Sequence, residues 1–392
     1  MWQCMEIRGA RVFCDGAFHD IPVFVDGDRF VSEASFFLHT AGRPIDILDG
    51  TGLLLLPGLT DIHMHGAVFA DVTDADAESL HRLLRYEAAC GVTQLLATTL
   101  SLPDETLAKA LSEIGSIVKK GGVANGAWLA GIHLEGPYLS ETKPGAHDAR
   151  FIKSASVDHF CYLNRLAGHA IRIISLAPET DGALDFMRDV RDDVRLSLAH
   201  TSADYDTASM AFAAGASHVT HLFNAMPPLH HREPGVIGAA LLHDDVSVEL
   251  IADGVHVHPA VISAVFRMFP GRVCLVSDSM RATGCGDGTF DLGGQKVTVS
   301  QNRATLADGR ISGSTTHLFD CLRHAVSCGI ALETAIYAAS EYPASRIGIL
   351  DEAGTVKPGR RANFILAEPD LTIRHVFVNG QETDPGLRSS AG

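Results

Sequence analysis

Eight short apolar segments, most of them separated by helical patterns, occupy the middle of this 392-residue chain. Continuous apolar runs of this length are typical of strands that are buried on both faces of a sheet. Because strand and helix alternate through eight units, the pattern favours a closed (β/α)8 barrel over an open sheet. The predicted strands are 53–65, 92–99, 128–135, 171–178, 196–200, 218–224, 246–253 and 273–278, and helical patterns fall at 77–90, 103–119, 181–193 and 204–214.

Both ends of the chain have a different pattern. Residues 1–56 alternate short apolar runs with Gly and Asp turns, and they show no helical period of useful length. A similar pattern of short strands returns after about residue 350. We therefore predict a barrel over residues 57–350 and a small β-sandwich domain that residues 1–56 and 351–392 build together.

The composition limits the class of partner. Lys and Arg total 31 against 47 for Asp and Glu, a net charge of −16, and no basic cluster interrupts it, which argues against nucleic acid. The eight cysteines occur singly at positions 4, 14, 90, 161, 274, 285, 321 and 328, which argues against a disulfide framework and a thiolate zinc site. The first residues lack a signal-peptide pattern, and no apolar run is long enough to cross a bilayer. We expect a cytoplasmic protein with no membrane partner.

Polar residues follow several predicted strands, at the end of the barrel where such folds place their active sites. Glu135 closes the third predicted strand, and His200 and His221 lie at the ends of the fifth and sixth. His63 and His65 are two apart on the first strand, so both side chains leave the same face and can reach one metal. Taken singly, each has a structural alternative, a salt-bridged carboxylate or a hydrogen-bonded core histidine. Five such residues on one rim favour a Zn²⁺ or Fe²⁺ site that activates water.

Asp278, at the end of the eighth predicted strand, is the candidate general base. A carboxylate near a cation is ionised at pH 7, so it can accept a proton from water and deliver it to a leaving nitrogen. The alternative role is a helix N-cap. That alternative is weak because Gly284, Gly286 and Gly288 follow closely and leave little room for a helix.

The loop 224–235, which follows His221, carries the candidate anion-binding group, Arg232. An arginine in a loop rich in Pro and Gly is more often simply solvated, but the planar guanidinium suits phosphate. His256 follows Asp253-Gly254 on the seventh predicted strand and can join it.

These motifs resemble the amidohydrolase superfamily, and within it the N-acetylglucosamine-6-phosphate deacetylases. The resemblance runs over nearly the whole chain and implies hydrolysis of the acetamide of N-acetylglucosamine 6-phosphate to glucosamine 6-phosphate and acetate, in a homodimer. It rests on Pro57-Gly-Leu-Thr-Asp-Ile-His-Met-His-Gly66, His133-Leu-Glu-Gly-Pro137, Gly145-Ala-His147, Leu176-Ala-Pro-Glu179, Ala199-His200, Thr220-His-Leu-Phe-Asn-Ala-Met-Pro227, Arg232-Glu-Pro-Gly235, Ala252-Asp-Gly-Val-His256, Ser277-Asp278 and Gly313-Ser314.

The resemblance implies a division of the metal ligands. Glu135, His200 and His221 hold the principal ion, and His63 and His65 offer a second position. One or two divalent ions per subunit, Zn²⁺ or Fe²⁺, are expected.

The resemblance also implies the groups that act on the substrate. Asp278 is the base and acid, and His147 donates a hydrogen bond to the acetyl oxygen. Arg232 is expected to reach the site of the partner subunit. The expected contacts to the sugar phosphate are Ala146, Asn224, Ala225, Arg232 and His256.

Two loops depart from the family pattern, residues 312–317 and the stretch 228–231 with its histidine pair. They leave the sugar open, because galactosamine and glucosamine differ at one hydroxyl that a loop side chain can read. A different N-acyl amidohydrolase is a further alternative, against which Arg232 and His256 argue. A catalytically inactive scaffold is another, against which the complete ligand set argues.

Overall fold

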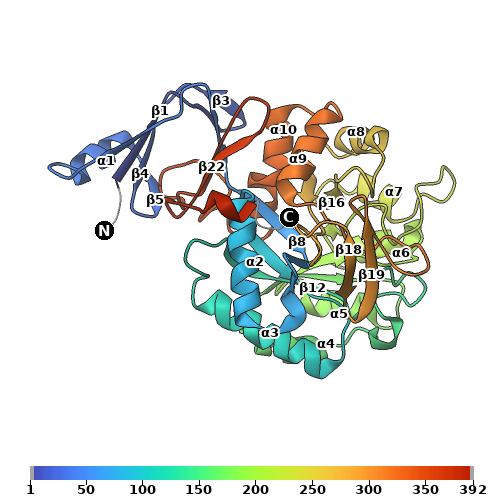
Figure 1. Ribbon diagram of the computed structural model, residues 1–392. Helices are drawn as coiled ribbons and strands as arrows, with labels where there is room; N and C mark the ends of the chain where they lie inside the picture. Colours follow the sequence, from blue (N-terminus) through green and yellow to red (C-terminus); the bar gives the residue numbers. More distant parts are fainter. Residues whose placement is uncertain (1–3, 389–392) are drawn as a thin grey trace.

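The computed structural model describes residues 4–388 and shows a parallel barrel joined to smaller sheets (Figure 1). The barrel strands lie side by side in chain order, and each pairs in parallel with the next. The last returns to the first, where the backbone N–H of Asp278 donates to the carbonyl of His63 at 2.9 Å. The predicted (β/α)8 fold is confirmed. The strands are β8 (Leu59–Met64), β11 (Val92–Thr98), β12 (Trp128–Glu135), β13 (Ile171–Leu176), β14 (Arg195–Leu198), β15 (His218–Val219), β16 (Ser247–Ile251) and β17 (Val273–Val276).

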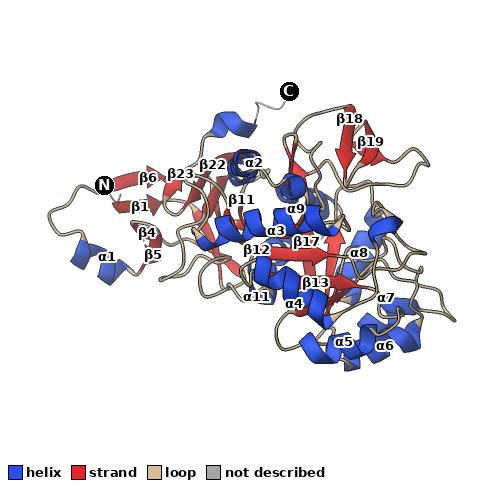
Figure 2. Cartoon of the chain, turned by 90° about the horizontal axis from the view of Figure 1, so that it is seen from below, coloured by secondary structure: helices blue, strands red, loops and turns tan. Residues whose placement is uncertain are grey.

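Helices follow the barrel strands and pack around them (Figure 2). Several begin at an Asp or Ser whose side chain accepts a hydrogen bond from the first turn, as Asp76 does from Ser79 and Asp204 from Thr207. No helix within residues 4–388 is long and apolar enough to span a membrane. The helices are α2 (Ala77–Ala89), α3 (Asp104–Lys119), α4 (Val157–Leu166), α5 (Ala183–Val190), α6 (Tyr205–Ala213), α7 (Gly235–Leu242), α8 (Pro259–Met268), α9 (Leu318–Ser327), α10 (Leu332–Ala339) and α11 (Glu341–Arg346).

The first predicted strand, residues 53–65, is two strands in the structure. β7 (Leu54–Pro57) belongs to an outer sheet, and β8 begins the barrel at Leu59. Gly58 lies between them, and a Cβ there would come within 2.0 Å of the Thr93 hydroxyl oxygen. The chain therefore passes from the outer sheet to the barrel at a position where only glycine fits, because there is no room for a side chain. The pattern did not separate the two strands because both are wholly buried.

Two sheets form the outer domain, and one of them combines strands from both ends of the chain. In the six-stranded sheet the order is β23-β22-β21-β7-β2-β3, so C-terminal strands pair with N-terminal ones. A buried cluster that includes Ile7, Val25, Leu55 and Phe364 joins this sheet to the four-stranded one, and this is the predicted sandwich. The strands are β1 (Cys4–Arg8), β4 (Val23–Asp26), β5 (Arg29–Val31) and β6 (Asp46–Asp49) in the smaller sheet, and β2 (Arg11–Cys14), β3 (Ala17–His19), β7, β21 (Phe364–Ala367), β22 (Ile373–Val378) and β23 (Gln381–Glu382) in the larger. Helix α1 (Glu33–His39) packs beside β4.

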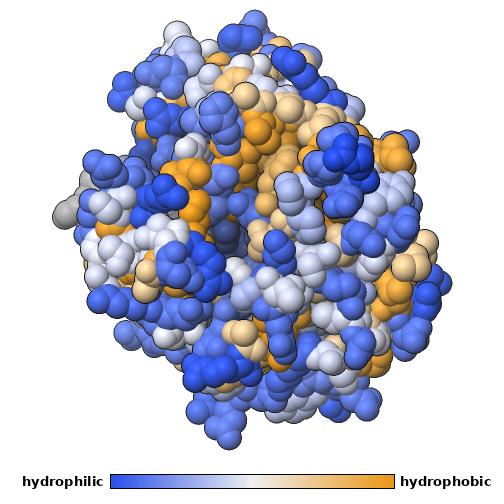
Figure 3. Space-filling model, turned by 90° about the vertical axis from the view of Figure 1, so that its right-hand side faces the viewer, coloured by the Kyte–Doolittle hydropathy of each residue, from blue (hydrophilic) through white to orange (hydrophobic). Residues whose placement is uncertain are grey.

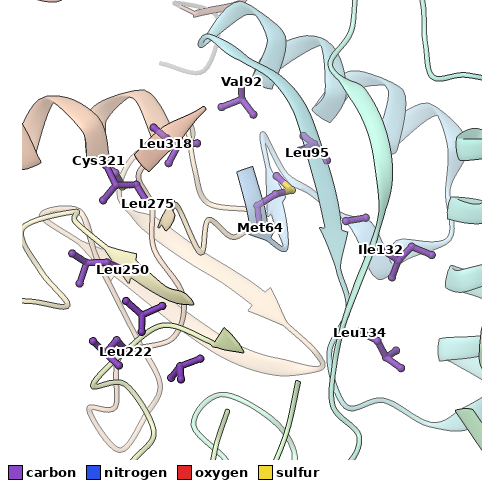
Figure 4. Packing of buried hydrophobic residues seen from close by; sticks show 14 of the residues in the cluster. Met64, Val92, Leu95, Ile132, Leu134, Leu222, Leu250, Leu275, Leu318 and Cys321 are labelled. Atoms are coloured by element: carbon purple, nitrogen blue, oxygen red, sulfur yellow. The ribbon is translucent and has the colours of Figure 1, made fainter. Parts of the chain in front are cut away.

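A large buried hydrophobic cluster fills the space between barrel and helices, and Figure 4 shows part of it. Met64, Leu250 and Leu318 all belong to this cluster. At the end of β8, Met64 lies between His63 and His65, the residue just after the strand, so apolar and polar side chains leave opposite faces of the chain. The same strand therefore contributes both to the core and to the polar interior of the barrel.

A small antiparallel sheet lies between β17 and α9, and it was not predicted from the sequence. It consists of β18 (Gly288–Leu292), β19 (Gln295–Ser300) and β20 (Arg303–Thr305). The turn between β18 and β19 is Gly293-Gly294, and both glycines have positive φ. In Figure 1 this sheet stands beside the barrel, away from the sandwich domain.

Candidate metal centre and active site

The carboxylate of Glu135 lies between two pairs of histidines. Its Oε1 is 3.0 Å from Nε2 of His221 and 3.2 Å from Nε2 of His200. Its Oε2 is 3.6 Å from Nε2 of His63 and 3.4 Å from Nε2 of His65. In each of these triads the ligand atoms all lie within 4.8 Å of one another. The structure therefore brings the four predicted histidine ligands together around the carboxylate of Glu135.

Outer hydrogen bonds fix the orientation of two of these imidazoles. Nδ1 of His65 lies 3.0 Å from the carbonyl oxygen of Thr98, and Nδ1 of His200 lies 3.0 Å from that of Lys143. A carbonyl oxygen only accepts, so each Nδ1 carries a hydrogen, and Nε2 is the ring nitrogen that faces the site.

Glu249, a fully buried residue of β16, supports two further ligands. Its Oε2 lies 2.8 Å from Nδ1 of His63 and accepts the backbone N–H of His221 at 3.2 Å, while its Oε1 lies 3.0 Å from Nε2 of His218. Burial acts to raise the pKa of Glu249, but the charge of His63 and the hydrogen bond to His218 hold that pKa well below its usual value. One carboxylate thus positions a side chain and a main-chain segment of the ligand set.

The donor set fits a divalent cation. Nε2 of His63 is buried without a hydrogen-bond partner among the described residues. A buried polar atom without a partner destabilises the fold, and a bound cation would supply that partner. Nε2 of His200 and Nε2 of His221 lie only 3.2 Å apart. Converging imidazole nitrogens around a carboxylate, without a thiolate, suit Zn²⁺ or Fe²⁺.

Three site residues have left-handed backbone just beyond a strand. The φ angles are +43° at His200, +31° at His221 and +49° at Asp278. Residues other than glycine rarely adopt such angles, and the residues that do so are often found at functional sites. β14 ends at Leu198 and β15 at Val219, so the predicted strands 196–200 and 218–224 are too long: these side chains leave a sharp turn after the strand.

Asp278 faces both histidines of the first strand. Its Oδ1 lies 3.2 Å from Nε2 of His65 and 3.5 Å from Nε2 of His63. Burial acts to raise the pKa of Asp278, but the hydrogen bond to His65 and the charge of His63 lower it to about 2. The carboxyl group is therefore ionised at neutral pH, as a proton acceptor must be.

His147 is neutral, and its tautomer is fixed. Burial and the charge of His200 lower the pKa of His147 to about 4. The backbone N–H of Ser101 donates to Nδ1 at 3.0 Å, so the ring hydrogen is on Nε2. That Nε2 lies 3.3 Å from Oε2 of Glu135. His147 therefore offers a hydrogen-bond donor at the metal-ligand cluster.

The cluster opens into a cavity of about 360 Å³. Figure 3 shows that this face of the molecule is hollowed, with hydrophilic side chains in the depth of the hollow and hydrophobic ones along part of its rim. Four of the predicted substrate contacts, Ala146, Asn224, Ala225 and His256, line the cavity together with Asp278.

Arg232 does not line this cavity. It is exposed in the loop 224–235 and donates to Nε2 of His231 at 2.7 Å. His256 is the nearer candidate for an anion, with its Nδ1 2.7 Å from Oδ2 of Asp253. Burial acts to lower the pKa of His256, but the hydrogen bond to Asp253 and its charge raise it above the usual value, which favours the imidazolium.

Comparison with known proteins decides the family. The pattern of the amidohydrolase family matches residues 54–383. The chain belongs to the amidohydrolase family. It is 37% identical to the N-acetylglucosamine-6-phosphate deacetylase of Vibrio furnissii, over 92% of this chain and 90% of that one. It is 35% identical to the N-acetylgalactosamine-6-phosphate deacetylase of Escherichia coli O157:H7, over 86% and 90%.

A solved structure agrees with this assignment. A point mutant of the N-acetyl-D-glucosamine-6-phosphate deacetylase from Mycobacterium smegmatis, in complex with N-acetyl-D-glucosamine-6-phosphate, superposes with a TM-score of 0.88 at 30% identity. The match covers 97% of this chain and 99% of that one. Amidohydrolases of this family are metal-dependent, in keeping with the donor set around Glu135.

Several residues that line the cavity of this amidohydrolase were not predicted from the sequence, among them Lys143, Leu292 and Arg310. Arg310 donates to the carbonyl of Gly145 at 2.6 Å, and the side-chain amide of Gln295 donates to the carbonyl of Ala146. The β18–β20 sheet and the segment after it therefore hold the loop that carries His147. The sequence does contain a signal for this sheet, because alternating apolar and polar residues flank Gly293-Gly294 on both sides, as in a β-hairpin.

Proposed function

We propose that this amidohydrolase removes the acetyl group of N-acetylglucosamine 6-phosphate, giving glucosamine 6-phosphate and acetate. The observation that carries the proposal is one cavity that contains an ionised carboxylate (Asp278), a neutral imidazole donor (His147), the converging metal ligands and a histidine suited to an anion (His256). The relatives named above support the choice of substrate.

The residues divide the chemistry of amide hydrolysis. We propose that Glu135, His200 and His221 would hold a divalent ion, Zn²⁺ or Fe²⁺, which when bound would supply Lewis acidity and activate water at neutral pH. Asp278 accepts the proton of the attacking water and returns it to the leaving nitrogen. The Nε2–H of His147 donates to the acetyl oxygen as negative charge develops there.

We further propose that His63 and His65 hold a second ion, because Oε2 of Glu135 faces them while Oε1 faces the other pair. A carboxylate oriented in this way is suited to bridging two positions. The occupancy of this second position is measurable as the ratio of metal to protein.

The phosphate is proposed to lie at the rim, near His256 on one subunit and Arg232 on the other. Arg232 is exposed and does not line its own cavity, so a homodimer that brings Arg232 to the neighbouring cavity gives it a ligand. Ala146, Asn224 and Ala225 are proposed to contact the sugar, because they line the cavity between the metal ligands and the rim.

We also propose that the enzyme acts in the cytoplasm. All eight cysteines are free, and most of them are buried. Unpaired thiols are typical of proteins that work in a reducing compartment.

The galactosamine epimer is the second candidate substrate, since a relative that acts on it is 35% identical. The test measures acetate release from N-acetylglucosamine 6-phosphate, N-acetylgalactosamine 6-phosphate, unphosphorylated N-acetylglucosamine and a set of N-acyl amino acids. We expect the highest kcat/KM for the first. A higher value for the second would reassign the epimer, and a preference for the N-acyl amino acids would overturn the proposal.

A further inference from the structure

A second cavity, of about 440 Å³, lies at the other end of the barrel, where β13 and β14 begin. It is separated from the metal-ligand cluster by the length of the strands. Its walls come from the segments that precede three consecutive barrel strands and from the end of helix α11. The charged and titratable residues that line it are His169, Arg172, Arg191, Asp192, Asp193, Arg195 and Arg346.

None of the four arginines forms an ion pair within the part of the chain that the structure describes. Nε of Arg172 donates to the carbonyl of Ala130 at 2.6 Å, and Nε of Arg195 donates to the carbonyl of Arg346 at 2.6 Å. These neutral acceptors satisfy individual N–H groups. They do not neutralise the charge, and for the partly buried Arg172 and Arg195 the loss of water without a counter-charge is costly.

Two of the guanidinium groups keep donors free for a ligand. Arg191 makes no side-chain hydrogen bond within residues 4–388, and it packs so closely over Gly215 that a Cβ there would lie 2.7 Å from its own Cβ. Nε of Arg346 is buried without a hydrogen-bond partner in the same range. An unpaired buried donor beside a cavity indicates an acceptor that the protein itself does not supply.

The electrostatics of the cavity favour an anion. Burial lowers the pKa of Arg195 to about 10, and the charge of Arg346 adds to this effect. Asp192 and Asp193 line the same cavity but are outnumbered by the four arginines. This local excess of positive charge stands out in a protein whose net charge is −16.

We propose that this cavity binds a small phosphate-bearing anion through Arg191, Arg195 and Arg346. The planar guanidinium matches the geometry of phosphate oxygens, and several guanidinium groups around one cavity can donate hydrogen bonds to different oxygens of one phosphate. The volume lies in the range of small-molecule sites. The site does not depend on the metal chemistry at the opposite end of the barrel.

The test follows the thermal unfolding midpoint of the metal-loaded protein as inorganic phosphate replaces chloride at constant ionic strength. Ligand binding to the folded state raises the midpoint, so the response gives an apparent affinity. Arg191→Met removes an exposed guanidinium without breaking a side-chain hydrogen bond, and Arg191→Lys keeps the charge without the planar fork. Arg188→Met is the matched control, because Arg188 lies on the adjoining helix α5 and pairs with Asp185.

We expect Arg191→Met to weaken the apparent phosphate affinity about tenfold, Arg191→Lys to weaken it less, and Arg188→Met to leave it unchanged. Arg232→Met distinguishes phosphate binding in this cavity from binding at the proposed substrate site, and the phosphate-dependent rise in the unfolding midpoint should persist in this variant. A response that survives in Arg191→Met, or one that disappears in Arg232→Met alone, would overturn the proposal. So would the absence of any phosphate response in the wild-type protein.

Discussion

Oε2 of Glu249 lies 2.8 Å from Nδ1 of His63, and both side chains are wholly inaccessible to solvent. The contact places a carboxylate behind a histidine that we propose as a metal ligand. Such a partner fixes the tautomer and the ring orientation and raises the basicity of the ligating nitrogen. Because Glu249 also accepts the N–H of His221, it links the two halves of the ligand set.

Replacing Glu249 by Gln keeps the size of the side chain and a hydrogen-bonding oxygen but removes the charge. We expect Glu249→Gln to weaken metal binding roughly 10–100-fold, as is usual for an outer carboxylate. Competition with a chelator measures this affinity independently of catalysis. Glu87→Gln, which also removes a fully buried carboxyl group, is the control and should bind metal normally. An unchanged affinity in Glu249→Gln would show that its contact with His63 is only structural.

The purified protein should carry one to two equivalents of divalent ion, measured by elemental analysis. Glu135→Ala and His200→Ala should each lose both the principal ion and activity, because too few donors remain for a tight site. A preparation shown to be free of metal yet fully active would contradict the assignment of these ligands.

Asp278→Asn retains the shape of the side chain but cannot accept a proton. We expect kcat to fall roughly 10²–10⁴-fold, the usual range for the loss of a general base. Equilibrium binding of substrate should largely survive, and metal content is measured alongside. Turnover near the wild-type rate with unchanged metal content would remove Asp278 from the mechanism.

The sequence predicted the barrel and the ligand set because both leave strong local signals. A carboxylate or histidine at the end of a buried apolar run, such as Glu135 or His200, breaks the hydropathy pattern at a definite place. β12 has the predicted bounds, residues 128–135, since Gly-Pro follows it directly. Parallel strands then bring these ends to one rim without any further information.

The contacts that support the site leave no such signal. Glu249 lies inside an apolar run on β16, and its pairing with His63 depends on closure of the barrel, which joins residues far apart in the chain. The same holds for Arg310 and Gln295, which hold the loop of His147 from a sheet inserted after β17. Local patterns indicate where a polar residue stands but not which partner the fold brings to it.

Glu87 offers a prediction about pH. This residue of α2 is fully buried, and burial together with the charge of Asp61 raises its pKa to about 8. The folded protein therefore holds a proton that the unfolded chain releases above about pH 4.5. Stability from this group is complete at low pH and is lost as the pH rises toward 8.

Glu87→Gln removes this titration. At pH 8.5 we expect the variant to be more stable than the wild type by up to about 4 kcal/mol, and at pH 5 the difference should be below about 1 kcal/mol. Denaturant unfolding at the two pH values measures it. Glu78→Gln, an exposed change on the same helix, is the control. A difference between Glu87→Gln and the wild type that does not grow with pH would contradict the raised pKa.

Arg232 is predicted to bind the 6-phosphate of a sugar held mainly by the other subunit. The pair of guanidinium and phosphate is charge-assisted and specific in shape, so Arg232→Met should raise KM strongly for the phosphorylated sugar. The poor activity on free N-acetylglucosamine should hardly change. Steady-state kinetics on both sugars measure the contrast, and equal losses on the two would argue against a phosphate contact.

Mixing two impaired variants tests whether Arg232 acts across the dimer. A heterodimer of Arg232→Met and Asp278→Asn contains one cavity with an intact Asp278 from the first chain and an intact Arg232 from the second. Activity at a substrate concentration where each homodimer is nearly inactive should therefore return on mixing. A tag on one chain establishes that subunits have exchanged. If heterodimers form and no activity returns, Arg232 acts within its own subunit or does not contact the phosphate, since a contact across the interface requires one restored cavity in every heterodimer.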